Sequence, residues 1–145
     1  GHIIQVSSVL GIATMPVLGV YNATKFAIEG LSETLSTEVF DFGIKVTLLE
    51  PNGYATDWAP VSALHSAPIA AYDRIREGFQ AGFTDDVFGV PEATSEAVLQ
   101  LVDSENPPLR LFLGKLALPW VKQVYAQRLS VWDQWADVSV TAHGK

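Results

Sequence analysis

The chain has 145 residues, of which 48% are hydrophobic and 17% are charged, so it is long enough to bury the core of one ordinary domain. Its 9 Lys and Arg against 16 Asp and Glu give a net charge of -7, which disfavours nucleic acid as a partner. The absence of cysteine excludes disulfides, a thiolate nucleophile and Cys-ligated metal sites, and it is compatible with a cytoplasmic location. No apolar run reaches the ~18 residues of a membrane-spanning helix, so we expect no membrane partner.

The first half of the sequence predicts a strand, a helix and a second strand. His2–Val6 has the pattern of a short buried strand that ends at a pair of serines. Apolar residues at three- and four-residue intervals predict a helix from Val20 to about Phe42, and Gly43 suits the left-handed position beyond it. Residues 44–49 predict a second strand, which stops at the turn signal Pro51-Asn52-Gly53. This order is the unit that builds a parallel sheet.

The second half predicts an irregular segment followed by a helix, a strand and a last helix. Residues 57–90 are interrupted by proline and glycine, although residues 70–79 have helical spacing. We expect a helix from Pro91 to about Val102, a strand at 109–113 and a helix from about Pro119 to Val138. The predicted fold class is therefore α/β, with a partial parallel sheet of about three strands and flanking helices. Because the chain enters a strand at once and has no initiator Met, we expect it to be the carboxyl-terminal part of a larger domain.

Three polar residues near the end of the first strand and on the following helix form a candidate catalytic group. Tyr21 and Lys25 are four residues apart, so their side chains share one face of a helix. An ammonium close to a phenol favours the phenolate, which predicts a tyrosine that exchanges a proton at neutral pH. Ser8 lies at the carboxyl end of a strand, where parallel sheets place ligands, and its hydroxyl can orient a substrate oxygen. Together these groups suit the reversible reduction of a carbonyl.

These residues also have purely structural interpretations. Tyr and Lys at helical spacing are common on solvated faces, and the pair taken alone is more often structural than functional. The three histidines, His2, His65 and His143, lack the spacing of metal ligands, so we predict no metal site. The sequence also has no Gly-x-Ser-x-Gly elbow that would support a serine hydrolase.

The order and spacing of three motifs resemble the short-chain dehydrogenase/reductase family. The motifs are Gln5-Val6-Ser7-Ser8-x-x-Gly11, Tyr21-x-x-x-Lys25 and Pro51-Asn52-Gly53-x-x-Thr56. The serine lies 13 residues before the tyrosine, as is common in the family, and the resemblance covers at least residues 1–58. It implies a Rossmann-type fold, a doubly wound parallel sheet that is present here in part, and an oxidoreductase that uses NAD or NADP to interconvert an alcohol and a carbonyl. It further implies that this chain lacks the amino-terminal half, which carries the family's phosphate-binding glycines, and is inactive alone.

The resemblance also implies roles for individual residues. Tyr21 is the expected proton donor or acceptor and contacts the cofactor, Ser8 holds the reacting oxygen, and Lys25 binds the hydroxyls of the nicotinamide ribose. Four residues of the loop after the second strand are expected to line the nicotinamide pocket: Pro51, Asn52, Gly53 and Thr56. Asn52 departs from the family, which usually has Gly at this position, although Asn tolerates positive φ better than most residues.

The resemblance divides the one domain, residues 1–145, into three parts. They are a catalytic segment at 1–58, a substrate lid at about 57–90 and a final helix–strand–helix part at 91–138. Four apolar residues of the lid either face the substrate or pack on the protein: Trp58, Leu64, Tyr72 and Phe79. The expected partner is a small-molecule alcohol or carbonyl.

Members of the family commonly form dimers or tetramers, partly through the helix that carries the tyrosine. Ala23, Ala27 and Gly30 are small enough to allow another helix to approach closely, so we expect a homo-oligomer. Two alternatives stay open at this point. One is a non-catalytic domain of the same fold that senses nucleotide or serves as a subunit, and the other is a purely structural or interaction domain.

Overall fold

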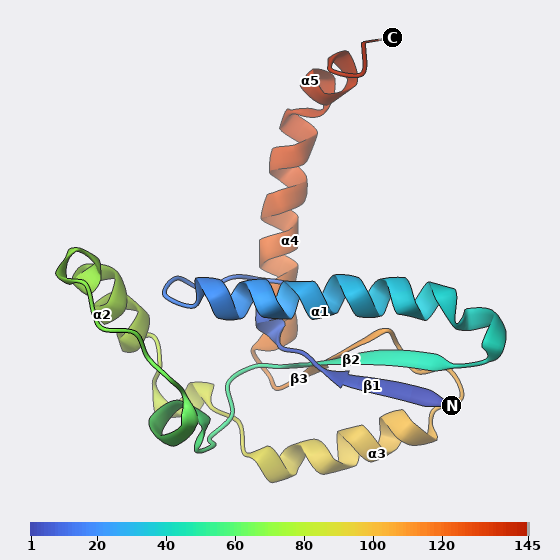
Figure 1. Cartoon of the computed structure of the whole chain (residues 1–145), viewed down its shortest axis with the longest axis horizontal. Helices are drawn as coiled ribbons and strands as arrows, with labels where there is room; N and C mark the ends of the chain where they lie inside the picture. The colour runs from blue at the N-terminus through green and yellow to red at the C-terminus, as the bar shows by residue number, and fades with distance from the viewer. Residues whose placement is uncertain (145) are drawn as a thin grey trace.

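Three parallel strands form a sheet that carries helices on both faces (Figure 1). The computed structural model describes residues 1–144, in which the strands β1 (His2–Val6), β2 (Lys45–Pro51) and β3 (Arg110–Leu113) lie in the order β1-β2-β3. Helix α1 (Gly19–Glu38) runs across one face between β1 and β2, and α3 (Ser95–Asp103) covers the other before β3. This arrangement confirms the predicted α/β class and the partial, doubly wound parallel sheet.

The sheet register brings the serine segment beside the loop that follows β2. Val6 pairs with Leu49, and the N–H of Ser7 donates to the Leu49 carbonyl at 3.0 Å, so the pairing continues past the end of β1. Strand β2 itself extends to Pro51, which pairs with Leu113 of β3. The sequence predicted a strand over residues 44–49 that stops at the turn signal beginning with Pro51. A proline is tolerated at the end of a strand, where its missing N–H costs little.

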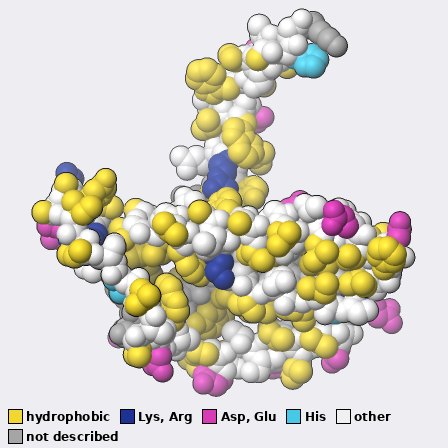
Figure 2. All heavy atoms as spheres, in the orientation of Figure 1, with side chains coloured by type: hydrophobic (Ala, Val, Ile, Leu, Met, Phe, Trp, Pro, Cys, Tyr) yellow, Lys and Arg dark blue, Asp and Glu magenta, His cyan; other side chains and the backbone are white. Residues whose placement is uncertain are grey.

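The buried residues of helix α1 are polar. The recurring apolar residues by which the sequence predicted this helix are not the ones that it buries. Its buried residues are Asn22, Glu29 and Ser32. Leu31 is 65% exposed and Phe26 is 38% exposed, and apolar side chains are visible along the outer side of this helix in Figure 2. Arg110 of β3 lies beneath the buried side of α1, and its guanidinium donates to Glu29. The apolar period therefore identified the helix correctly but did not indicate which face is buried.

Two predicted helices are shorter than expected because one turn of each is a 3₁₀ helix. Helix α1 ends at Glu38, and Phe40–Phe42 form a separate 3₁₀ turn. Gly43 follows with φ of 66°, which confirms its predicted left-handed conformation. The helix predicted from Pro91 begins with the 3₁₀ turn Pro91–Thr94 before α3 starts. Tighter turns of this kind are frequent at helix ends.

The remaining helices, α2, α4 and α5, are not the ones that cover the two faces of the sheet. Helix α2 (Asp73–Ala81) belongs to the predicted lid, and it follows a 3₁₀ turn at Ala70–Tyr72. The predicted last helix is divided into α4 (Ala117–Gln134) and α5 (Ala136–Thr141), which project away from the sheet (Figure 1). None of the helices within residues 1–144 combines the length and apolar character needed to cross a bilayer.

Two apolar clusters fix the sheet to its surroundings. One joins the loop after β1 to the start of α4, and its buried members are Val9, Leu10, Ile12, Ala117 and Val121. The other lies between the sheet and α3, and its buried members are Leu49, Leu101 and Leu113. Tyr21 and Phe112 pack on the edge of the first cluster, so the apolar packing after β1 also supports the candidate tyrosine.

Candidate active site

Ser8 stands at the point where β1 gives way to a 3₁₀ turn, Val9–Gly11. Its backbone is extended, with φ of -169° and ψ of 153°, and its side-chain Oγ accepts from the N–H of Leu10 at 3.2 Å. The hydroxyl oxygen thus accepts a bond that caps the turn, and the hydroxyl hydrogen is still available for donation. The side chain is buried, so its donor points into a partly dry environment. The role that the sequence predicts for this hydroxyl, holding a substrate oxygen, needs such a free hydrogen.

Tyr21 and Lys25 stand on the first part of α1 and interact with each other. The Lys25 Nζ lies over the Tyr21 ring, 5.6 Å from its centroid, as their spacing on one helix face predicts. The same Nζ donates to the Val6 carbonyl at 3.2 Å. Because Val6 is the last residue of β1 and Ser8 follows two positions later, this bond holds the Lys25 ammonium beside the serine segment.

Two residues near the tyrosine were not singled out by the sequence. Asn22 is buried, and its Nδ2 donates to the Met15 carbonyl at 2.9 Å, which ties the loop after β1 to the start of α1. Val17 in the same loop has φ of 71°, a left-handed conformation that is unusual for a β-branched residue. Strain of this kind costs about 1–3 kcal/mol and needs surrounding structure to hold it. An asparagine directly after the motif tyrosine is a signal in the sequence that could have pointed to Asn22, whereas its burial appears only in the structure.

The loop after β2 is pinned by backbone hydrogen bonds to the segment before α3. The Gly89 N–H donates to the Gly53 carbonyl at 2.9 Å, and the Ala55 N–H donates to the Gly89 carbonyl at 2.9 Å. Thr56 follows at the exposed end of the loop, where its Oγ1 accepts from the N–H of Trp58 at 3.4 Å. These bonds hold the predicted nicotinamide loop, residues 51–56, at the carboxyl end of the sheet.

Asn52 keeps this loop in shape by its side chain and not by a left-handed backbone. Among the non-glycine residues of 1–144, positive φ occurs at Val17, so the conformational tolerance of asparagine is not used at position 52. The Asn52 Nδ2 donates to the carbonyl of Gly53 at 2.8 Å, and its backbone N–H donates to Leu113 at 3.0 Å. Its Oδ1 packs closely against Gly114, where a Cβ would overlap it.

An apolar pocket of about 260 Å³ opens at the carboxyl end of the sheet, on the side of α3. Its walls include the last residue of β1, Val6, and the loop residue Pro51. Tyr54 also lines it, and burial raises the pKa of this phenol above its ordinary value, so the wall stays uncharged. Val6 therefore faces the pocket with its side chain while its carbonyl accepts from Lys25. A flat ring with little polar surface fits the shape and the lining of such a pocket.

The segment predicted as a lid contacts the candidate site through Trp58. The Trp58 ring packs on Tyr21 with 5.6 Å between centroids and an interplanar angle of 49°. Phe79 packs on Phe83, and Phe83 on Phe88, which lies against Gly53 of the loop. Of the other lid residues singled out in the sequence, Leu64 and Tyr72 are exposed.

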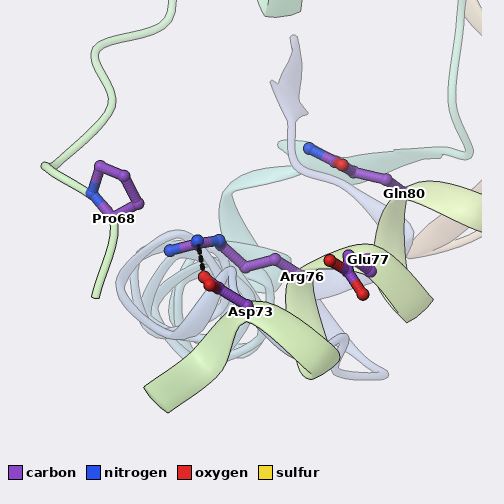
Figure 3. Close-up of a pocket in the computed structure, with 5 residues that line it drawn as sticks. All are labelled: Pro68, Asp73, Arg76, Glu77 and Gln80. Carbon is purple, nitrogen blue, oxygen red and sulfur yellow. Dashed lines mark hydrogen bonds and ion pairs between the residues drawn. The ribbon is translucent and has the colours of Figure 1, made fainter. Parts of the chain in front are cut away.

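A second, polar cavity of about 440 Å³ lies beside α2 and apart from these residues. Its lining residues are Pro68, Asp73, Arg76, Glu77 and Gln80. Figure 3 shows the ion pair of Arg76 with Asp73 on one wall and Pro68 opposite. Within residues 1–144, no three His, Asp or Glu side chains are grouped so that they could hold a metal ion.

Comparisons with known proteins agree with the observed fold. Residues 1–64 match the short chain dehydrogenase family. "Oxidoreductase BOA17" from Botryotinia fuckeliana is 35% identical over 98% of this chain and 53% of the relative. A crystal structure of a short-chain dehydrogenase from Streptomyces avermitilis aligns with a TM-score of 0.84 and 31% identity, over 97% of this chain and 52% of that one.

A more distant structure shares the fold alone. A short chain dehydrogenase from Burkholderia cenocepacia in complex with NADP aligns with a TM-score of 0.56 and 20% identity, over 92% of this chain and 46% of that one. The chain spans about half the length of the curated relatives that it matches, 53% and 43% for two of them. With Ser8 just after β1, Tyr21 and Lys25 on α1, and these similarities over almost its whole length, the chain belongs to the short-chain dehydrogenase/reductase family.

Proposed function

We propose that the intact protein containing this chain is an oxidoreductase that uses NAD or NADP to interconvert a small-molecule alcohol and its carbonyl. One observation carries the proposal: the Lys25 ammonium lies over the Tyr21 ring and also donates to the end of the strand that leads to Ser8. This hydrogen bond ties Lys25 to the end of β1, which distinguishes it from a lysine that is merely solvated on a helix face. A cytoplasmic location, with which the lack of cysteine is compatible, is part of the same proposal.

The three side chains divide the work on the substrate oxygen. In the reducing direction Tyr21 gives its phenol proton to the oxygen, and in the oxidising direction it takes the proton back. The positive charge of Lys25 stabilises the negative charge that develops on the phenol oxygen. Ser8 donates its hydroxyl hydrogen to the same substrate oxygen, while one of its two lone pairs accepts from the N–H of Leu10.

The cofactor supplies or accepts the hydride when it is bound. The apolar pocket suits the nicotinamide ring, and its border includes Pro51 of the loop that we propose to hold the ring together with Asn52, Gly53 and Thr56. Lys25, at the edge of this region, is placed to bind the ribose hydroxyls, and Tyr21 lies beside it. The complex of the Burkholderia protein with NADP supports the choice of cofactor class.

We further propose that residues 57–90 close over the substrate. Trp58 already packs on Tyr21, which places an aromatic wall next to the reacting group. The lid therefore excludes water from one side of the tyrosine and offers an apolar surface to the carbon skeleton of the substrate.

The test is the oxidation of NADH and NADPH, followed by absorbance, with a panel of aldehydes and ketones. We expect the intact protein to turn over at least one carbonyl and the 145-residue chain alone to turn over little or none. A nucleotide-sensing domain would bind cofactor without oxidising it with any carbonyl, and that result from the intact protein would contradict the proposal.

Ser8→Ala should lower kcat about 10²-fold in the intact protein, since it removes a hydrogen bond to the reacting oxygen. It also removes the cap on residues 9–11, so we expect a loss of about 1 kcal/mol in the free energy of unfolding. Steady-state kinetics and urea unfolding measure the two effects. Ser8→Thr keeps the hydroxyl and should recover most of kcat, and an equally inactive but stable threonine variant would count against the assigned role.

The outer face of α1 is the surface through which we propose that the protein forms a homo-oligomer. Ala23, Ala27 and Gly30 are all exposed on this face, next to the exposed apolar side chain of Leu31. Ala27→Glu should therefore raise the dissociation constant of the oligomer about tenfold or more, as light scattering after size exclusion would show. Gln100→Glu adds the same charge to α3 and should leave the oligomer unchanged. An unchanged mass for Ala27→Glu would exclude this face.

A further inference from the structure

Beneath α1, two acidic side chains meet in the interior. Glu50 of β2 is 0% exposed, and Glu29 of α1 is 5% exposed. Within residues 1–144, both carboxyl oxygens of Glu50 and the Oε1 of Glu29 are buried and lack a hydrogen-bond partner. Two ionised carboxylates are acceptors only, so they cannot satisfy each other. One proton between them would give each group a partner.

The contacts of the two carboxyls indicate which of them carries the proton. The Oε2 of Glu29 accepts from Arg110 Nε at 2.9 Å, and Arg110 Nη2 donates to Glu33 at 2.6 Å. The guanidinium of Arg110 therefore pairs with Glu29, and we assign the shared proton to Glu50. Burial is the largest cause that raises the pKa of Glu50 to about 9, followed by the neighbouring carboxyl of Glu29, against the opposing charges of Arg110 and Lys25.

The pair lies among the three segments that carry the family motifs. Residues 21, 25 and 29 lie one helical turn apart, so Glu29 continues the row of Tyr21 and Lys25 on α1. Glu50 directly precedes the Pro51–Thr56 loop. Ser7 directly precedes Ser8, and its buried Oγ lies close to Glu29, because a Cβ at Gly11 would touch Ser7 Oγ at 2.9 Å and Glu29 Oε1 at 3.0 Å.

We propose that Glu29 and Glu50 are a positioning pair, in which one shared proton holds α1 on β2 so that Tyr21 and Lys25 stand correctly over the end of β1. The assignment rests on the proposed function for the role of Tyr21 and Lys25, but the shared proton itself does not. Loss of this proton at alkaline pH puts two negative charges face to face in the interior. The repulsion then loosens α1 and moves the tyrosine away from Ser8.

The proton linkage has a definite sign. Glu50 holds its proton in the folded state up to about pH 9 but releases it near pH 4.5 in the unfolded chain. Between these values the folded state binds about one more proton, so the free energy of unfolding falls as the pH rises. The groups that face Glu50 are Glu29 and Lys25 on α1 and Arg110 on β3.

Glu50→Gln tests the pair directly in the intact protein. A glutamine amide can still donate to Glu29, but it does not titrate. We expect the free energy of unfolding of this variant, measured by urea at pH 6 to 9, to lose a downward slope of about one proton. The infrared band of a protonated carboxyl should disappear as well. Glu33→Gln removes the exposed partner of Arg110 and should change neither result. A wild-type slope and band in Glu50→Gln would overturn the shared proton.

Activity tests the positioning role separately. The alkaline fall of kcat of the wild type should move to higher pH in Glu50→Gln, with KM at pH 7 unchanged, whereas Glu33→Gln should keep the wild-type profile. If the alkaline fall of kcat is unchanged in Glu50→Gln although the carboxyl band is lost, the proton on Glu50 is only structural. That result would overturn the positioning role of the pair. If the wild type has no activity, the proposed function fails, and loss of the slope and band would still establish the pair as a structural link.

Discussion

Replacing Tyr21 with Phe should lower kcat of the intact protein about 10²–10⁴-fold, the contribution that a general acid–base makes. The variant removes the phenol O–H and keeps the ring, which packs on Trp58 and on the apolar cluster after β1. The fold and the melting temperature should therefore stay as in the wild type. Steady-state kinetics at saturating substrate, with circular dichroism of the same samples, measure both quantities.

Tyr72→Phe is the matched control for this experiment. Tyr72 is an exposed tyrosine of the lid, 56% exposed, so the same loss of a hydroxyl should leave kcat within about twofold. A Tyr21→Phe protein that kept most of its kcat would show that the proton comes from another group. If Tyr21→Phe fails to fold, Lys25→Met is the alternative test. It leaves the tyrosine in place and should also lower kcat.

Gly114→Ala should lower the free energy of unfolding by about 2–5 kcal/mol, from overpacking and from an unfavourable backbone conformation. Gly114 has φ of 96°, and a Cβ there would overlap the Oδ1 and Cγ of Asn52. Asn52 has little room to move, since its Nδ2 donates to Gly53 at 2.8 Å. Gly78→Ala on α2, where a Cβ meets nothing within 4 Å, should instead stabilise the protein by about 0.5–1 kcal/mol.

A double-mutant cycle separates the two causes. Asn52→Gly restores the residue that the family usually has and removes the overlapping amide, so it should recover about half of the loss caused by Gly114→Ala. The remaining loss is the backbone strain at Gly114, which no change at position 52 relieves. Urea unfolding of the two single variants and the double variant gives the coupling energy. Additive losses would mean that the amide moves aside at no cost.

Local patterns predicted the sheet well and the packing of its helices poorly. The β-branched run before Pro51 and the apolar run at residues 109–113 each contain a strand, because buried parallel strands read as continuous apolar segments. The periodicity after Val20 likewise identified α1. It did not reveal that this helix packs on a sheet surface carrying Glu50 and Arg110. Which face a helix buries depends on residues that are distant in the sequence.

The candidate site was predicted as far as it depends on spacing. The four-residue interval places Lys25 over the Tyr21 ring, as a helix requires. The bond from Lys25 to Val6 and the contact of Trp58 with Tyr21 join segments that only the fold brings together. The same holds for Asn52 and Gly114, whose tight packing could not be inferred from the substitution of a family glycine.

The most direct measurement follows an isotope from cofactor to product. The intact protein is supplied with a reduced nicotinamide cofactor that carries deuterium at the transferable position, together with a carbonyl that supports cofactor oxidation. Mass spectrometry of the alcohol should find the deuterium on the former carbonyl carbon, and Tyr21→Phe should form this product at a rate lower by the factor given above. An alcohol without the label, or equal labelling rates in the two proteins, would contradict hydride transfer beside a proton-donating tyrosine.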